Sequence, residues 1–147
     1  MFKHILLPTD GSKLSEKAVK LGIEFAKKTQ ARVTAIHVVP EFKLMADEGI
    51  AIMNPAVKKR FDEEGRARAQ KMLDGIAGRA RAQGVRCATV SVASDLPYQQ
   101  IIAVAKNKKC DLIMMASHGR RGLSSLLLGS ETAKVLTHSK VPVLVVR

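Results

Sequence analysis

Short apolar runs alternate with amphipathic stretches along the whole chain. The apolar runs predict five strands, at residues 3–7, 32–39, 85–92, 111–116 and 141–146. After the first four runs, apolar residues recur at helical spacing, which predicts helices. Strands that alternate with helices are typical of one doubly wound α/β domain, here over residues 1–147. Right-handed crossovers would place helices on both faces of a parallel sheet.

Turn and cap residues predict where the helices begin and end. Ser12 is expected to cap the first helix, and Asn54–Pro55 is a typical start for the second. Gly84 is expected to stop the second helix, although Gly65, Gly75 and Gly78 weaken it. Ser94 or Asp95 is expected to cap the third helix, and residues 40–54 are interpreted as a long loop.

The helical spacing also predicts which side chains each helix buries. The expected inner faces are Leu14, Ala18, Leu21 and Phe25 in the first helix, Val57, Phe61, Ala69, Met72, Ile76 and Ala80 in the second, and Tyr98, Ile101, Ile102 and Ala105 in the third. Met114 and Met115 are expected to fill the core.

The last strand has the features of a sheet edge. Pro142 has no N–H to donate to a neighbouring strand, which suits an edge or the start of a strand. The residues that follow are apolar on both faces, and an exposed apolar edge is prone to pair with another chain. Two explanations stay open: a second copy pairs with it across a two-fold axis, or the monomer covers it.

The composition indicates a folded chain with excess positive charge. Its 147 residues are 46% apolar, enough for an aliphatic core, which excludes a disordered chain. The 25 basic and 13 acidic residues give a net charge of +12, so nucleic-acid binding is one hypothesis. However, the basic residues are scattered along the chain, and four Phe, one Tyr and no Trp offer few rings for stacking on bases. These features favour a solvated basic surface.

The cysteines and the N-terminal segment indicate a cytoplasmic protein. Cys87 and Cys110 lie far apart without a metal-binding spacing, so we expect free thiols in a reducing compartment. Pro8 interrupts the first apolar run, and no stretch has the length of a membrane span.

A ligand site is expected beyond the carboxyl ends of the strands, where such sheets bind ligands. The loop over residues 116–130 carries glycines, two arginines, and Gly129–Ser130 at a predicted helix start. Glycines let main-chain N–H groups approach an anion, and a helix N-terminus favours phosphate. The loop has neither the P-loop pattern nor the Gly-x-Gly-x-x-Gly of dinucleotide-binding domains. A tight turn with a helix cap is the alternative.

Five segments together resemble the universal stress protein family. They are Ile-Leu-Leu-Pro-Thr-Asp-Gly-Ser (5–12), His-Val-Val (37–39), Asp-Leu-Ile-Met-Met-Ala-Ser-His-Gly (111–119), Leu-Leu-Leu-Gly-Ser (126–130) and Val-Pro-Val-Leu-Val-Val (141–146). The resemblance implies the strand order 3-2-1-4-5, which brings the loops after the first and fourth strands together. It also implies a homodimer through the last strand, Val141–Val146.

The ATP-binding branch of that family carries Gly-x2-Gly-x9-Gly-Ser/Thr. This chain matches at Gly119, Gly129 and Ser130, with Ala116 in place of the first glycine, where the added methyl would narrow the approach to a phosphate oxygen. The resemblance implies that Asp10 lies at the adenosine, that the backbone of Val38 contacts adenine or ribose, and that Mg²⁺ or Mn²⁺ accompanies the phosphates. The nucleotide-binding residues it implies are Pro8, Thr9, Asp10, Val38, Ala116, Ser117, His118, Gly119, Arg120, Gly122, Gly129, Ser130 and Glu131.

Three functions follow as hypotheses. The first is an ATP-binding, nucleotide-dependent regulator of a stress response that acts on a protein partner. The second is slow ATP hydrolysis in the same site, with His118 as a base or Glu131 orienting water, and the third is nucleic-acid binding. Structural roles are the alternatives for three of these residues: Asp10 would brace a turn, His118 stabilise one, and Glu131 complement the helix dipole.

Overall fold

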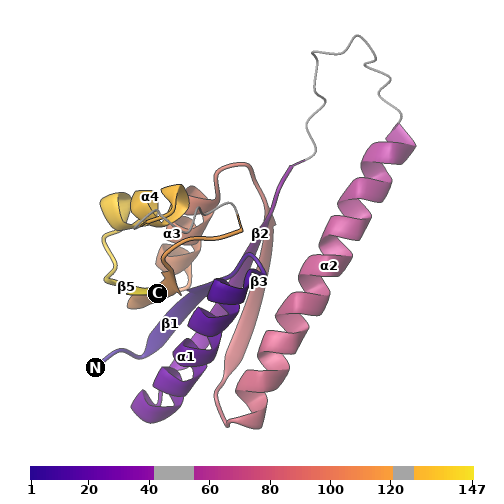
Figure 1. Cartoon of the computed structure of the whole chain (residues 1–147). Coiled ribbons are helices and arrows are strands. Elements are labelled where there is room, and N and C mark those ends of the chain that lie inside the picture. Colours follow the sequence, from indigo (N-terminus) through magenta and orange to yellow (C-terminus); the bar gives the residue numbers. More distant parts are fainter. Residues whose placement is uncertain (42–54, 121–127) are drawn as a thin grey trace.

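Five parallel strands form the centre of the structure, a computed structural model that describes residues 1–41, 55–120 and 128–147 (Figure 1). The strands lie side by side in the order β3-β2-β1-β4-β5. They are β1 His4–Pro8, β2 Arg32–Val39, β3 Cys87–Ala93, β4 Leu112–Ala116 and β5 Val143–Val146. The helices are α1 Lys13–Thr29, α2 Pro55–Ala82, α3 Pro97–Asn107 and α4 Ser130–His138. The predicted α/β fold and strand order are therefore confirmed.

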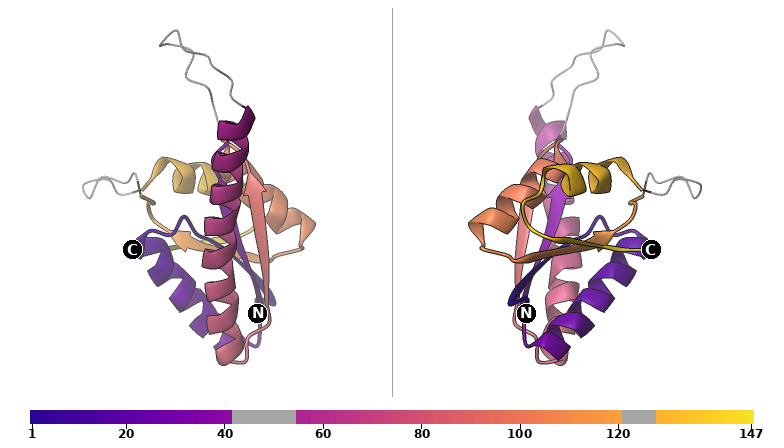
Figure 2. Two further views of the ribbon diagram at one scale, coloured as in Figure 1. Left: turned by 90° about the vertical axis from the view of Figure 1, so that its right-hand side faces the viewer. Right: turned by 90° about the vertical axis from the view of Figure 1, so that its left-hand side faces the viewer.

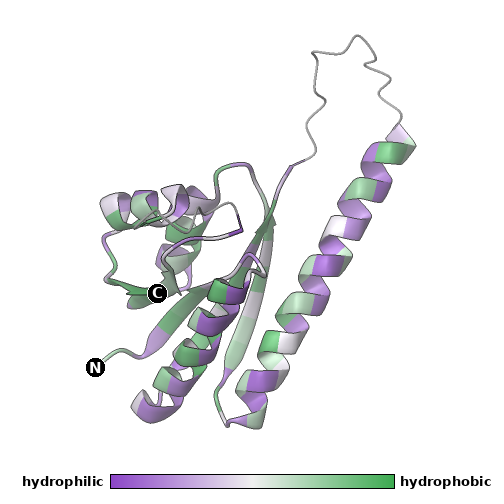
Figure 3. Ribbon diagram, in the orientation of Figure 1, coloured by the Kyte–Doolittle hydropathy of each residue, from purple (hydrophilic) through white to green (hydrophobic). Residues whose placement is uncertain are grey.

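The two faces of the sheet carry separate apolar clusters, because successive side chains of a strand point to opposite sides. On β1, Ile5 and Leu7 pack into a cluster with α1 and α2, whereas Leu6 packs into another with α3 and α4. The helices accordingly cover both faces (Figure 2), and the strands are largely hydrophobic (Figure 3). Met114 and Met115 are buried in β4, one in each cluster, as predicted.

The cap of α1 and the stop of α2 were predicted correctly, but the cap of α3 was not. Ser12 Oγ accepts a hydrogen bond from the N–H of Ser15, and Gly84 follows α2 with φ +75°, which glycine adopts without strain. Pro55 begins α2, and Asn54 lies outside the described residues. At α3 the cap position is held by Leu96, whose side chain makes no cap hydrogen bond. Neither predicted residue caps this helix, because Ser94 Oγ accepts a hydrogen bond from Leu96 N and Asp95 Oδ1 accepts one from Glu41 N.

The predicted inner faces of α1 and α2 are confirmed only in part. Leu21, Val57 and Phe61 are 37%, 55% and 38% exposed, contrary to prediction, and Leu73 is buried in α2 instead. The N-terminal turns of α2 extend past the strands (Figure 1), so Val57 and Phe61 find no sheet to pack on. The glycines of α2 do not interrupt it, because the helix is continuous from Pro55 to Ala82.

Two strands begin two residues later than predicted because local hydrogen bonds hold their first residues in turns. Val85 N donates to Ala80 O at the end of α2, so β3 begins at Cys87. Ser139 Oγ donates to Val141 O and accepts from Val141 N, so β5 begins at Val143. β5 forms one edge of the sheet, and its Leu144 is 36% exposed.

The two cysteines are free thiols, as predicted. Cys110 is buried, and burial together with the nearby Asp111 raises its pKa to about 11. Within residues 1–41, 55–120 and 128–147, no helix combines the length and the hydropathy that crossing a bilayer requires. In the same part of the chain, no group of three or more His, Cys, Asp or Glu side chains is placed to hold a metal ion.

Candidate functional site

The carboxyl ends of β1 and β4 lie side by side at the centre of the sheet. β1 pairs with β2 on one side and with β4 on the other, so the chain leaves β1 and β4 at the point where the strand order reverses. Ligands of open α/β sheets bind at this point. We call the residues gathered here the carboxyl edge: Asp10–Ser12, Val38, Ser117–Arg120 and Gly129–Ser130.

One carboxylate joins the loops after β1 and β4. Asp10 Oδ1 accepts a hydrogen bond from Ser12 N at 3.0 Å, and Asp10 Oδ2 accepts one from Arg120 N at 2.8 Å. A Cβ added at Gly119 would overlap Asp10 Oδ2. Glycine at this position therefore lets the two loops close on each other, and Asp10 does brace its turn.

Hydrogen bonding keeps Asp10 ionised. Burial alone would raise the pKa of this carboxyl group. The hydrogen bonds from Ser12 and from the backbone of Arg120 favour the charged form and outweigh burial, so the pKa of Asp10 is lowered. A carboxylate has about four lone-pair positions, and the N–H groups of Ser12 and Arg120 occupy two of them, while the side chains of Ser12 and Ser15 also favour the charged form.

The main chain of Val38 faces the same region. Thr9 N donates to Ile36 O, so the N–H and C=O of Ile36 point toward β1. Because these groups alternate in direction along a strand, the N–H and C=O of Val38 point to the same side of β2. β1 has ended by that level, since Pro8 is its last residue and pairs with Ile36. Among the described residues, no hydrogen bond occupies the N–H or C=O of Val38 on that side. Its side chain packs against the cluster beneath α3.

The N-terminus of α4 completes the carboxyl edge. Gly129 N donates to Ser117 O at 2.7 Å, which holds the start of α4 beside the end of β4. A Cβ added at Gly129 would lie 3.1 Å from His118 Cα, so a side chain here would press on the backbone. Among the described residues no side chain caps α4, and the first N–H groups of a helix have no partner within it. Such an end favours an anion.

Gly11 is a part of this edge that the sequence did not single out. Its φ is +77°, and a Cβ added there would lie 2.8 Å from both Arg120 Nη2 and Met72 Cε. The guanidinium of Arg120 therefore lies over the turn after β1. The Asp-Gly pair indicates the turn, but nothing local indicates the residues 61 and 109 positions away.

The remaining predicted residues are mostly engaged in the fold. Thr9 Oγ1 accepts from Gly11 N, and Ser117 Oγ lies 3.1 Å from His118 Nδ1, which suits a turn-stabilising role for His118. Glu131 Oε2 accepts from Tyr98 N at 2.8 Å, so it supplies the cap that α3 lacks. Pro8 is buried as the last residue of β1, and Gly122 lies outside the described residues.

The methyl group of Ala116 belongs to the core. Ala116 is 7% exposed and packs in the cluster with α1 and α2. Its carbonyl accepts a hydrogen bond from Thr132 Oγ1 at 2.9 Å. Because this methyl is part of the packing beneath the sheet, the expectation that it narrows the approach to a phosphate finds no support in its placement.

The sequence model of the Universal stress protein family matches residues 1–147. The chain belongs to the universal stress protein family. It is 36% identical over 150 residues to universal stress protein MJ0531 of Methanocaldococcus jannaschii, covering 100% of this chain and 83% of that protein. It is 32% identical over 149 residues to universal stress protein YxiE of Bacillus subtilis, covering 100% of both.

Solved structures of family members share the fold. The structure of the hypothetical protein MJ0577, from Methanocaldococcus jannaschii, matches with a TM-score of 0.83 at 29% identity, covering 99% of this chain and 96% of that one. A universal stress protein crystallised with cAMP matches with a TM-score of 0.70 at 24% identity, covering 99% and 97%. A universal stress protein from Arabidopsis thaliana with AMP bound matches with a TM-score of 0.68 at 16% identity, covering 97% of this chain and 90% of that one. At 24% and 16% identity, the last two matches show a shared fold only.

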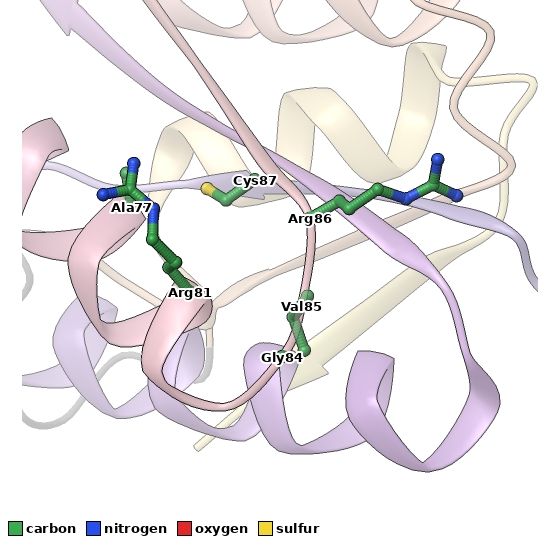
Figure 4. A pocket seen from close by; sticks show the side chains of 6 residues that line it. All are labelled: Ala77, Arg81, Gly84, Val85, Arg86 and Cys87. Carbon is green, nitrogen blue, oxygen red and sulfur yellow. The ribbon is translucent and has the colours of Figure 1, made fainter.

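This universal stress protein also has a cavity of about 330 Å³ far from the carboxyl edge. It lies at the turn between α2 and β3 and is lined by Ala77, Arg81, Gly84, Val85, Arg86 and Cys87. Figure 4 shows Arg81 and Cys87 on one side of the chain, while the Arg86 side chain extends on the other. None of the predicted site residues lines it, so this cavity belongs to the opposite end of the sheet.

Proposed function

We propose that this universal stress protein binds ATP at its carboxyl edge and acts as a nucleotide-dependent regulator. The observation that carries the proposal is the gathering of three complementary groups at one edge. These groups are the unpaired main chain of Val38, the ionised carboxylate of Asp10 and the uncapped N-terminus of α4. The crystallised family members with cAMP and AMP support it, because they show that this fold holds adenine nucleotides in those proteins.

Each group fits one part of the nucleotide. The N–H and C=O of Val38 match the donor and acceptor pattern of an adenine edge, and Asp10 can accept hydrogen bonds from ribose hydroxyls. The N–H groups at Ser130 and Glu131 and the guanidinium of Arg120 suit a phosphate chain. Mg²⁺ or Mn²⁺ would enter with the phosphates, whose oxygens are its preferred ligands.

The same contacts give the nucleotide a way to act on the fold. Asp10 links the loops after β1 and β4 through Arg120 N, and a ribose hydroxyl would share that carboxylate. Nucleotide binding would thus change how tightly the two loops are joined, and with it the surface offered to a protein partner. We favour binding over hydrolysis because the two candidate catalytic side chains already have partners in the fold. Glu131 accepts a hydrogen bond from Tyr98 N, and His118 Nδ1 lies within hydrogen-bond distance of Ser117 Oγ.

Calorimetric titration with Mg-ATP tests the nucleotide proposal. We expect saturable binding with one nucleotide per chain, and at least a tenfold loss in Asp10→Ala. Nucleotide released by heating freshly purified protein should contain adenine by mass spectrometry. No heat of binding and no released nucleotide would contradict the proposal. Phosphate release above that of Gly129→Val would revive the hydrolysis hypothesis.

We further propose a homodimer through β5 that lies in the cytoplasm, where free thiols such as Cys87 persist. β5 is an edge strand with Leu144 exposed, and pairing with a second copy would cover both its backbone and its apolar side chains. Leu144→Asp should convert the dimer to a monomer in light scattering. Leu21→Asp, at a similarly exposed leucine of α1, should leave it a dimer. A monomeric unmodified protein would contradict this proposal.

A further inference from the structure

The amino edge of the sheet carries a basic residue at the start of every strand. In strand order these are Arg86 before β3, Arg32 at the start of β2, Lys3 before β1, Lys108 and Lys109 before β4, and Lys140 before β5. All six side chains are exposed. We call this row the basic edge. Residues that are scattered in the sequence are therefore gathered by the parallel topology.

Hydrogen bonds fix three of these residues on neighbouring strands. Arg32 N donates to Lys3 O at 3.0 Å, and Val33 N donates to Arg86 O at 2.9 Å. Neighbouring strands are about 4.8 Å apart, so the row over the five strands spans about 19 Å. The backbones of Lys3, Arg32 and Arg86 are thus held on adjacent strands, and the other three cations lie in the turns before β4 and β5.

The basic edge lacks the acidic partners found elsewhere on the molecule. Along α2, Lys58, Lys59 and Arg60 pair with Asp62, Glu63 and Glu64. Among the described residues, no ion pair engages any member of the basic edge. Asp111, a carboxylate beside this edge, accepts hydrogen bonds from the backbone N–H groups of Lys3 and His4.

The helix dipole explains the cations at the helix ends but not the whole row. Lys27, Lys28, Arg81 and Lys106 lie in the last turns of α1, α2 and α3, where the helix dipole favours positive charge. Lys108, the C-cap residue of α3, shares this explanation. Lys3, Arg32 and Arg86 lie beyond the last helical turns, where the dipole effect has fallen off, and like charges on adjacent strands repel. An external polyanion would relieve this repulsion.

We propose that the basic edge binds the phosphate backbone of duplex nucleic acid without reading its sequence. A duplex carries one negative charge per about 1.7 Å of its axis, so the six cations of the basic edge would meet a dense array of phosphates. Sequence-independent contact with phosphates needs no aromatic platform. An anionic membrane fits less well, because membrane binding also needs apolar side chains to insert. Among the exposed large apolar residues that the structure describes, only Met1 lies within two residues of the basic edge in the sequence.

Fluorescence anisotropy with a labelled 20-base-pair DNA duplex, and with the matching RNA duplex, tests this proposal at 50–200 mM salt. Four to six phosphate contacts would give a slope of log affinity against log salt of about −4 to −5. In Lys3→Gln/Arg32→Gln/Arg86→Gln we expect at least a tenfold loss of affinity and a slope about three units shallower. The triple variant Lys108→Gln/Lys109→Gln/Lys140→Gln should show a similar loss of affinity and a similar change in slope.

The matched control is Lys58→Gln/Lys59→Gln/Arg60→Gln, which removes the same charge from paired positions. It should keep the slope of the unmodified protein, and all three variants should keep their affinity for Mg-ATP, which separates this proposal from the nucleotide site. Denaturant unfolding confirms that each variant is folded. Equal losses in edge and control variants, no binding at 50 mM salt, or tighter binding to phosphatidylserine vesicles than to either duplex would overturn the proposal.

Discussion

The two edges of the same sheet present opposite kinds of polar group. At the carboxyl edge, main-chain N–H groups and the ionised Asp10 lie within a glycine-lined turn. At the amino edge, exposed lysines and arginines surround the buried side chain of His4. Parallel strands require every crossover helix to begin at one edge and end at the other, so the two edges inherit opposite ends of the helix dipoles. Binding at the carboxyl edge therefore depends on the geometry of individual hydrogen bonds, whereas binding at the amino edge depends on the number of charges.

His4 shows how the amino edge acts on its own core. Its Nε2 lies 2.8 Å from Thr34 Oγ1, while Nδ1 is buried and has no hydrogen-bond partner in the part of the chain that the structure describes. Burial lowers the pKa of His4, and the positive charge of Arg32 lowers it further. The backbone of Lys108 and, to a smaller extent, the nearby Asp111 raise the pKa without reversing this effect.

Gly119→Val breaks the carboxyl edge most severely. The added side chain must displace Asp10 Oδ2 and with it the hydrogen bond from Arg120 N. We expect at least a hundredfold loss of Mg-ATP affinity by calorimetry and a loss of about 2 kcal/mol in the free energy of unfolding. Gly78→Val, where nothing lies within 4 Å of an added Cβ, is the control and should bind normally. An affinity of Gly119→Val within threefold of the unmodified protein would contradict this role.

His4 makes the stability sensitive to mild acid. Because its pKa is lower in the folded state, its contribution is complete above about pH 6.5 and is lost as the pH falls from there toward the folded pKa. Urea unfolding between pH 6.5 and 5 should show a slope of up to about 1.4 kcal/mol per pH unit from this group. His4→Gln should remove that slope, and His138→Gln, at an exposed site, should retain it. An unchanged slope in His4→Gln would show that burial of His4 is not the cause.

Ala116→Gly separates packing from ligand binding at one residue. Its methyl is buried in the core, so we expect the free energy of unfolding to fall by about 1–2 kcal/mol, from the lost methyl and the added backbone freedom. The affinity for Mg-ATP should stay the same or rise. Weaker binding by more than threefold would mean that Ala116 does not occupy the first position of the glycine motif.

Gly75→Ala tests the smallest effect, in a part of α2 that belongs to neither edge. Gly75 is exposed, and nothing lies within 4 Å of an added Cβ. Replacing a helical glycine with alanine in open space should raise the free energy of unfolding by about 0.5–1 kcal/mol. Thermal unfolding would show a higher midpoint with unchanged nucleotide affinity. A lower midpoint would indicate that α2 has a partner surface at this position.

Hydrophobic periodicity was sufficient to predict the elements, but not the contacts that join them. The buried runs of β1 and β4 and the stop at Gly84 follow from local sequence. Val57 and Phe61 repeat at helical spacing but are exposed, because periodicity does not reveal where the sheet beneath a helix ends. The strand order came from the family resemblance and not from the pattern.

The site shows the same division. The polar loops after β1 and β4 were predicted from turn residues, but the cap of α3 comes from Glu131, 33 residues beyond Tyr98. Asp10 and Arg120 are 110 residues apart, and their hydrogen bond explains why residue 119 is glycine. Local propensity carries no information about partners at such separations, which only the folded topology brings together.

Amide chemical shifts on titration with Mg-ATP would test most directly which edge holds the nucleotide. Binding at the carboxyl edge predicts saturable shifts of the N–H resonances of Val38, Arg120 and Ser130, with those of Arg32 and Arg86 unchanged. Shifts confined to Arg32, Arg86 and the other residues of the basic edge would show that ATP is held only as a polyanion, and would contradict nucleotide binding at the carboxyl edge.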